Sequence, residues 1–142
     1  GMAGELGHLV IGGARPCGCR GMGHLETVAG ADGIESRARE LGLEPDVREL
    51  WLRRDDFRIR PLWEEVLQAL GSAVASLVHV IDPEAVILGG GLGPAPGFIE
   101  ALEPVVKRYL GEPYRDSLDL RPSMLGKSAA VIGAASLFTP AG

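Results

Sequence analysis

The sequence predicts an α/β fold in which helices cover a parallel-type sheet. A long stretch with apolar residues recurring every three or four positions stops at Asp82-Pro83. A continuous apolar run follows at residues 85–88 and leads directly into three glycines. Stretches with helical spacing and one short strand pattern complete the chain. The resulting order of helix, strand, glycine turn, helix, strand and helix is typical of a sheet with covered faces.

The first half of the chain is predicted to be helical. Residues 29–41 combine good helix formers with helical spacing, and Gly42 stands where a C-terminal cap is expected. A short helix is expected over residues 45–53. The clearest helix spans residues 61–81, because it begins with a proline and its apolar positions recur at three and four. It is apolar almost all round after Gly71, so we expect that part to be buried.

The second half is predicted to supply the strands. The continuous apolar run at residues 85–88 is typical of a strand buried on both faces. A helix is expected from residue 96 or 97 to about Leu110, a short strand around Leu118 and Leu120, and a small-residue helix over residues 128–138. No apolar run is expected to reach the roughly 18 to 20 residues that span a bilayer.

Three glycines, Gly89, Gly90 and Gly91, follow the predicted strand and allow two interpretations. A turn without side chains lets a nucleotide approach the backbone closely. Equally, the glycines form a plain tight turn into the next helix. The chain contains no G-x-x-x-x-G-K-[ST] phosphate loop and no G-x-G-x-x-G motif in the required context. From spacing alone, the plain turn is favoured.

Composition limits the function. The 142 residues suit one domain with a real core, and a net charge of −5 is unfavourable for non-specific nucleic-acid binding. Gly1 before Met2 is typical of a tag remnant, so the predicted domain is 2–142. No leader segment is recognised, which favours a cytoplasmic location. The one concentration of basic residues is interrupted by two aspartates and is expected to be a solvated surface. Its members are Arg48, Arg53, Arg54, Arg58 and Arg60, and the neighbouring Trp51 and Trp63 are expected to be core anchors.

Residues near the N-terminus suggest a metal site. His8, Cys17, Cys19 and His24 offer soft and borderline ligands that suit tetrahedral zinc, and the chain has no other cysteines. A disulfide between Cys17 and Cys19 would close a small, strained ring. Two buried reduced thiols with unrelated histidines are the other interpretation. From the residues alone, the metal site and the reduced thiols are equally supported.

Taken together, these segments resemble one family. G-E-L-G-H followed by C-G-C-R-G-M-G-H-L-E resembles the signature of the ROK family of repressors, uncharacterised reading frames and sugar kinases, in which G-E-x-G-H precedes C-x-C-G-x-x-G-C-x-E. The segments V-I-D-P-E-A-V-I-L-G-G-G-L and A-A-V-I-G-A-A-S-L-F resemble later parts of the same family. The resemblance implies the C-terminal half of an actin-like ATPase, ribonuclease H-like sugar-kinase fold, with an incomplete sheet and a zinc-binding loop near the N-terminus.

The resemblance also implies roles for individual residues. His8, Cys17 and Cys19 match zinc ligands, and His24 stands where the family usually has a cysteine. Arg20 replaces a common glycine. The sugar-binding residues it implies are Glu5, His8 and Glu26, and Gly89, Gly90 and Gly91 match the turn near the nucleotide in the kinases. The implied cofactors are structural zinc in this chain and ATP with magnesium in a complete kinase.

The implied function has two forms. A complete ROK kinase carries an Asp-Gly-Gly-Thr-type phosphate segment and an Asn-Asp pair with the catalytic aspartate before G-E-x-G-H. No residue of this sequence matches them, so we expect it to bind a sugar without phosphorylating it. The chain is therefore expected to be the sugar- and zinc-binding part of a sugar kinase. The alternative is the effector and dimerisation domain of a transcriptional regulator, or a stand-alone binding module.

The expected partners follow from the same resemblance and from the exposed sheet. The ligand class is a hexose or an N-acetylhexosamine, and the sequence does not name the sugar. A sheet without its first strands exposes an edge and an apolar face, which favours a homodimer or a swapped assembly. No direct binding to nucleic acid and no membrane association are expected.

Overall fold

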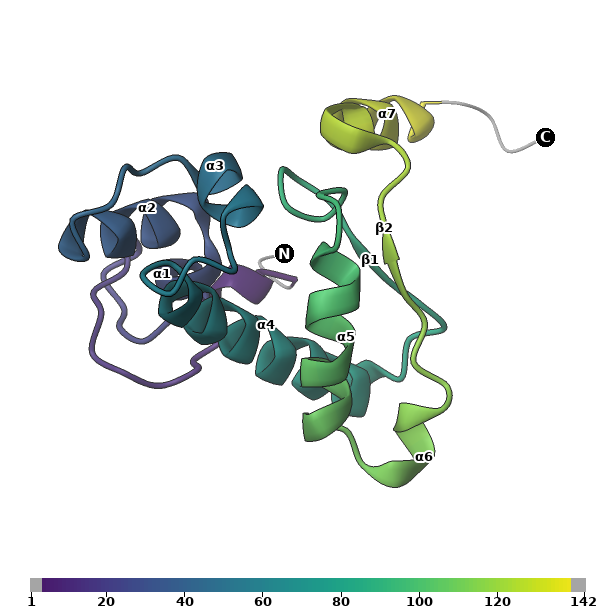
Figure 1. The fold of residues 1–142 in the computed structure, drawn as a ribbon. Helices are drawn as coiled ribbons and strands as arrows, with labels where there is room; N and C mark the ends of the chain where they lie inside the picture. The colour runs from purple at the N-terminus through teal and green to yellow at the C-terminus, as the bar shows by residue number, and fades with distance from the viewer. Residues whose placement is uncertain (1–3, 139–142) are drawn as a thin grey trace.

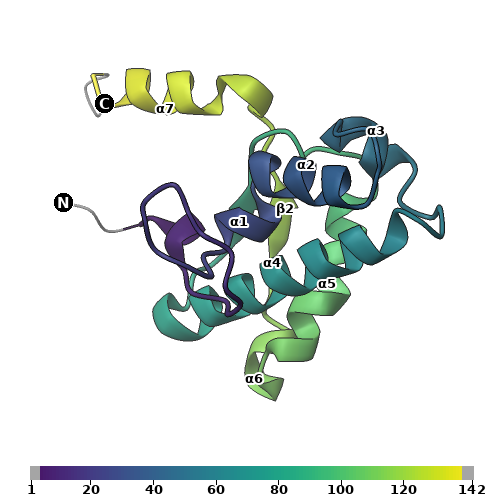
Figure 2. The same cartoon turned by 90° about the vertical axis from the view of Figure 1, so that its left-hand side faces the viewer.

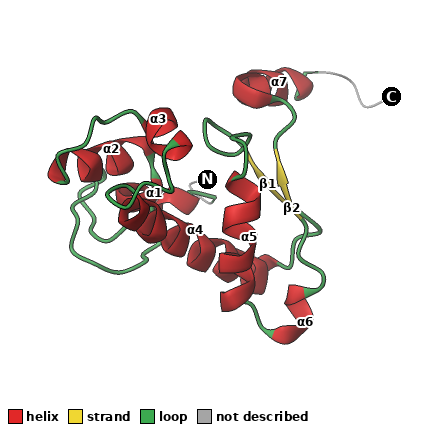
Figure 3. Cartoon of the chain, viewed as in Figure 1, coloured by secondary structure: helices red, strands yellow, loops and turns green. Residues whose placement is uncertain are grey.

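A computed structural model describes residues 4–138 (Figure 1), except for the side chains of Lys127 and Ala130. Helices predominate, and two short strands lie side by side near one end of the longest helix (Figure 3). The elements in chain order are η1 (Leu6–His8), α1 (Glu26–Ala29), α2 (Ala31–Glu40), α3 (Val47–Leu52), α4 (Arg60–Ile81), β1 (Val86–Leu88), α5 (Phe98–Tyr109), α6 (Glu112–Arg115), β2 (Leu120–Pro122), η2 (Gly126–Ser128) and α7 (Ala129–Ser136).

The central element is α4, which packs against α1 and α2 at one end and along α5 (Figures 1 and 2). Its buried residues join those of α3 and α5 in one apolar core. Trp51 and Trp63 are 1% and 2% exposed and meet edge to face, with ring centroids 4.9 Å apart, so the prediction that both are core anchors is confirmed. A second, smaller cluster of Leu25, Ala69 and Ala73 attaches the N-terminal loop to α4.

The long helix differs from prediction in two respects. Val80 and Ile81 are 81% and 60% exposed, so the expectation that the whole second half is buried is wrong. The helix is also long and apolar enough, by length and composition, to cross a membrane, which corrects the expectation that no stretch reaches that size. A core helix of a soluble protein meets the same two criteria, and nine residues of α4 between Leu62 and Val78 are buried within this chain.

The sheet of the described region consists of β1 and β2, which run parallel with Val86 opposite Leu120 and Leu88 opposite Pro122. The connection through α5 and α6 is the predicted strand–helix–strand unit. The prediction that β1 is buried on both faces is wrong, however, because Ile87 is 65% exposed. Its neighbours Val86 and Leu88 pack on the core, while nothing in residues 4–138 covers the other face.

The predicted helix over residues 29–41 is found as α2, Ala31–Glu40, and the separate short helix α1 before it was not predicted. Gly30 is extended, with φ −74° and ψ 158°, so α1 ends at Ala29 and α2 begins at Ala31. Glu26 forms the first residue of α1. The other helices appear within a few residues of their predicted limits, with Asp46 capping α3 through hydrogen bonds from the amides of Arg48 and Glu49.

The last helix, α7, ends two residues before the predicted limit of Phe138. Figures 1 and 2 both show it above the rest of the molecule, joined through η2 to β2. Its apolar side chains are largely uncovered: Val131 and Ile132 are 71% and 45% exposed, and Phe138 just beyond it is 89% exposed. This surface and the face of Ile87 are exposed apolar areas of the described residues.

Candidate metal centre

The predicted metal ligands lie on a two-sided loop that η1 introduces. The two sides pair in antiparallel fashion, Val10 opposite His24 and Pro16 opposite Met22. The amide of Cys17 donates to the carbonyl oxygen of Gly21 at 2.9 Å, which closes a tight turn at the tip. This pairing brings residues from both sides of the loop to one place.

The four predicted ligands converge. One ligand atom from each of His8, Cys17, Cys19 and His24 lies within 4.8 Å of the other three. Sγ of Cys19 is 3.3 Å from Nδ1 of His24, and the two imidazole rings have centroids 5.2 Å apart. Cys17 is buried and Cys19 is exposed, and both are free thiols, in agreement with the expectation of no disulfide. Two thiols and two imidazoles at this spacing fit the donor set of a closed tetrahedral zinc site.

Gly21 leaves the room that this convergence needs. A Cβ at this position would lie 2.5 Å from Cε1 and 2.9 Å from Nε2 of His24, and 3.3 Å from Sγ of Cys19. Any side chain would therefore push the imidazole away from the cysteine. Neither composition nor ligand spacing points to this residue, because the requirement arises only from the folded turn.

Glu26 lies directly beside the cluster. Its Oε1 accepts a hydrogen bond from Sγ of Cys17 at 2.7 Å and is 3.6 Å from Nε2 of His8. The carboxylate next to the thiol raises the pKa of Cys17 from 9.0 to about 11. A metal that takes Cys17 as thiolate would have to displace that proton. The structure thus brings two of the predicted sugar-binding residues, Glu26 and His8, close together.

Glu5 lies on the other side of the same short turn. The amide of His8 donates to the backbone carbonyl oxygen of Glu5 at 3.0 Å, and the Glu5 residue is exposed. Between them, Gly7 faces Glu26: a Cβ there would be 3.3 Å from Oε2 of that carboxylate. Of the three predicted sugar-binding residues, Glu5 and His8 therefore lie in one short turn, and Glu26 lies at the start of α1, which faces that turn.

A cavity of about 550 Å³ opens beside Cys17 and Glu26. It reaches across to the first turn of α2, and it does not include Glu5 or His8 among its lining residues. Its walls are formed by the loop and the two short helices: Arg15, Pro16, Cys17, Gly18, Glu26, Thr27, Gly30, Ala31, Asp32, Gly33, Ser36 and Glu40. Of the predicted sugar-binding residues, Glu26 lines this cavity.

The three glycines after β1 open a loop that folds back over the end of the strand. Gly89, Gly90 and Gly91 are exposed, and Gly90 has φ +73°. The tight approach occurs slightly later, at the buried Gly93, where a Cβ would overlap the carbonyl oxygen of Leu88. The sequence does not distinguish Gly93 from the other glycines of this segment, since its approach to Leu88 depends on how the turn folds.

Helix α3 supports the far end of this glycine loop. Nε1 of Trp51 donates to the carbonyl oxygen of Pro96 at 3.0 Å. Arg54 stacks on the same indole, with its guanidinium carbon 4.6 Å from the ring centroid. Arg54 is half-buried, because its guanidinium lies between Trp51 and the start of α5 at Gly97, while the other four arginines of the predicted solvated surface are exposed.

The signature residues, the metal cluster and the fold can be compared with known proteins. The ROK family model matches residues 1–141. The chain belongs to the ROK family. It is 32% identical to a glucokinase of Halalkalibacterium halodurans over 94% of this chain and 46% of that protein. It is 30% identical to an N-acetylmannosamine kinase of Haemophilus influenzae, over 95% of this chain and 45% of the relative.

Solved structures share the fold. A ROK hexokinase from Thermus thermophilus superposes with a TM-score of 0.80 at 36% identity, over 95% of this chain and 47% of the other. A ROK glucokinase from Streptomyces griseus, solved with glucose and AMPPNP, gives a TM-score of 0.78 at 25% identity, over 95% of this chain and 51% of the other. A ROK transcriptional regulator, described as a homologue of the E. coli MLC protein, gives a TM-score of 0.75 at 26% identity, over 94% of this chain and 37% of the other. The chain thus spans about half, or less, of the proteins it matches.

Proposed function

We propose that this chain is the C-terminal, sugar- and zinc-binding part of a ROK-family sugar kinase, organised as one domain over residues 2–142 and acting in the cytoplasm. The observation that carries the proposal is the convergence of His8, Cys17, Cys19 and His24 within 4.8 Å, with Glu26 against two of them. The relatives named glucokinase and N-acetylmannosamine kinase support a hexose or an N-acetylhexosamine as the ligand class.

The proposed zinc is structural. His8, Cys17, Cys19 and His24 would hold it, and zinc would neutralise the two thiolates and cross-link the loop to the turn of η1. Fixing His8 through one ring nitrogen sets its tautomer and leaves the rest of the ring to meet a sugar hydroxyl. Glu5 and Glu26 would accept hydrogen bonds from further hydroxyls, since ionised carboxylates are pure acceptors.

Nucleotide binding is proposed for Gly89, Gly90 and Gly91, which follow the carboxyl end of β1, where α/β folds hold phosphates. The solved glucokinase with AMPPNP supports a nucleotide in the complete kinase. General-base catalysis needs a carboxylate within reach of the attacking hydroxyl, and the family pattern gives no residue of this sequence that role. We therefore expect this chain alone to bind sugar without transferring phosphate.

A second candidate is the effector domain of a ROK transcriptional regulator. The similarity to the solved regulator, with a TM-score of 0.75, favours it. Sensing a sugar and phosphorylating it require the same contacts from Glu5, His8 and Glu26, so both candidates predict the same ligand. The sequence preceding G-E-L-G-H in the gene distinguishes them, through a helix-turn-helix in a regulator or the aspartate-containing segments in a kinase.

Self-association is proposed for either candidate. The uncovered face of Ile87, 65% exposed, and the exposed residues of α7 form apolar area that a second copy would bury. Sedimentation velocity at micromolar concentration is expected to show a dimer. A stable monomer would contradict this part of the proposal.

The proposal is tested by isothermal titration of the zinc-loaded chain with glucose, N-acetylglucosamine and N-acetylmannosamine. Binding of at least one sugar is expected, with heat lost in Glu26→Gln and retained in Glu35→Gln, a carboxylate variant on α2 that pairs only with Arg39 in the described contacts. Equal binding by the two variants would overturn the sugar-binding role of Glu26, and no binding by the unaltered chain would overturn the role of this half in holding the sugar.

A further inference from the structure

We propose that Arg15 is a positioning residue for the metal centre, whose guanidinium fastens the ligand loop to α2 and α4 and holds Cys17 ready for the metal. The inference rests on the proposed zinc site. Arg15 stands two residues before Cys17 in the sequence. Its carbonyl oxygen also accepts a hydrogen bond from the amide of Gly23 at 3.0 Å, directly before His24. The backbone of Arg15 therefore joins the side of the loop that carries Cys17 to the side that carries His24.

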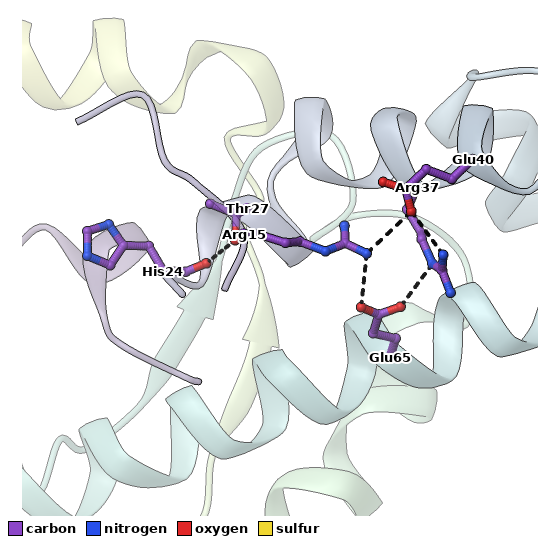
Figure 4. Close-up of polar contacts among 6 residues, drawn as sticks. All are labelled: Arg15, His24, Thr27, Arg37, Glu40 and Glu65. Atoms are coloured by element: carbon purple, nitrogen blue, oxygen red, sulfur yellow. Dashed lines mark hydrogen bonds and ion pairs between the residues drawn. The ribbon is translucent and has the colours of Figure 1, made fainter. Parts of the chain in front are cut away.

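The side chain of Arg15 reaches two carboxylates far away in the sequence (Figure 4). Nη2 is 3.4 Å from Oε1 of Glu65 on α4 and 3.7 Å from Oε2 of Glu40 on α2. Arg37 on α2 binds the same pair, with Nε 3.2 Å from Oε2 of Glu65 and Nη1 2.9 Å from Oε2 of Glu40. Both carboxylates thus contact Arg37 as well, and the pair with Arg37 keeps a net negative charge that faces Arg15.

These contacts are the ion pairs that tie the loop of residues 9–24 to other elements within the part of the chain that the structure describes. The base of the loop is attached differently, through Leu9 and Ile11 packed on the small cluster of α4. The tip, with the exposed Cys19, lies beyond that cluster. Arg15 is placed between the packed base and the tip, where a fixed point limits the movement of Cys17.

A loop that is already ordered pays less conformational entropy when a metal binds, so its affinity is higher. The Arg15, Glu65 and Glu40 side chains are 31%, 38% and 50% exposed, so water and salt screen the pairs partly. For partly exposed pairs of this kind, the loss of both contacts is expected to weaken zinc binding on the order of three- to tenfold.

The test compares zinc affinities by competition with a chromophoric chelator at low and high salt. Arg15→Gln is expected to raise the zinc Kd by the stated factor at low salt and to differ less from the unaltered chain at high salt. Arg39→Gln is the matched control, because it breaks an ion pair of α2 with Glu35, at 3.1 Å, that has no contact with the loop. The zinc Kd of Arg15→Lys, which keeps the charge, is expected to lie between those of the unaltered chain and Arg15→Gln. This variant tests the inference if Arg15→Gln does not fold.

Chemical unfolding of the metal-free proteins separates positioning from general stabilisation. If Arg15→Gln lowers the free energy of unfolding but leaves the zinc Kd unchanged, the inference is wrong while the zinc site stands. If the Arg39→Gln control weakens zinc binding equally, the effect is not specific to Arg15 and the inference is again wrong. If the unaltered chain binds no zinc, the proposed function fails first and the positioning role with it.

Discussion

Arg20 provides a sharp test of how the ligand loop is built. It has φ +72°, the left-handed region, in the turn whose amide bonds back to the carbonyl oxygen of Cys17 at 2.9 Å. An L-residue with a Cβ pays roughly 1–2 kcal/mol there. Glycine avoids that cost but loses about 0.5–1 kcal/mol through the greater freedom of the unfolded chain. Arg20→Gly is therefore expected to raise the free energy of unfolding by about 0.5–1 kcal/mol.

The assay is urea unfolding of the reduced, metal-free protein at neutral pH, with unchanged slope required for both variants. Ala14→Gly is the control, since Ala14 lies in the same loop and is exposed, and its φ is not positive. This control is expected to lose about 0.5–1 kcal/mol for the entropic reason alone. If Arg20→Gly is destabilised as much as Ala14→Gly, the left-handed strain assigned to Arg20 is refuted.

Three further perturbations address the site and its support. Gly21→Ala is expected to displace the facing imidazole and to weaken zinc binding about 10- to 100-fold in chelator competition; unchanged affinity would show that the turn adapts. The pKa of Cys17, raised from 9.0 to about 11 beside Glu26, gives the folded metal-free chain a stabilising contribution that is present below pH 9 and lost as the pH rises towards about 11. Across that pH range, the free energy of unfolding is expected to fall less for Glu26→Gln than for the unaltered chain. An equal fall in the two proteins would count against the contact between Cys17 and Glu26. Trp51→Phe leaves the carbonyl oxygen of Pro96 without its donor and is expected to cost about 1–2 kcal/mol in urea unfolding; a change within 0.5 kcal/mol, about that of a neutral surface substitution, would argue against this anchor.

Helix limits were predictable where local signals are strong. The periodicity from Leu62 onward, the proline at the start and Asp82 at the end place α4 within one residue of its observed limits. Helix α1, which precedes Gly30, was not predicted, because four residues are too few to show a helical spacing. The break at Gly30 depends on the close packing of α1 on α2, in which a Cβ at Gly33 would lie 2.5 Å from the carbonyl oxygen of Thr27.

Burial was less predictable than helix position. The run Val86-Ile87-Leu88 shows that both faces of the strand are apolar, but it carries no information about what covers each face. In residues 4–138 only the face of Val86 and Leu88 meets the core, and Ile87 is exposed. Likewise, the apolar pattern at the end of α4 carries no information about what covers Val80, which is exposed.

The candidate site was predictable in its ligands and not in its supports. The spacing of Cys17, Cys19 and His24, together with the family signature, indicated which side chains converge, and the structure brings them within 4.8 Å of one another with His8. Arg15 gave no signal, since its partner Glu65 is fifty residues away and only the folded chain joins them. Long-range ion pairs of this kind leave no local pattern in a single sequence.

The zinc content of the protein, measured by elemental analysis after purification without a metal-affinity tag, tests the proposed metal centre most directly. About one zinc per chain is expected, since one four-ligand cluster is present in the described residues, and His24→Ala is expected to lose the metal. A folded protein without zinc, or a His24→Ala variant that keeps it fully, would contradict the proposal that these four side chains form the metal centre.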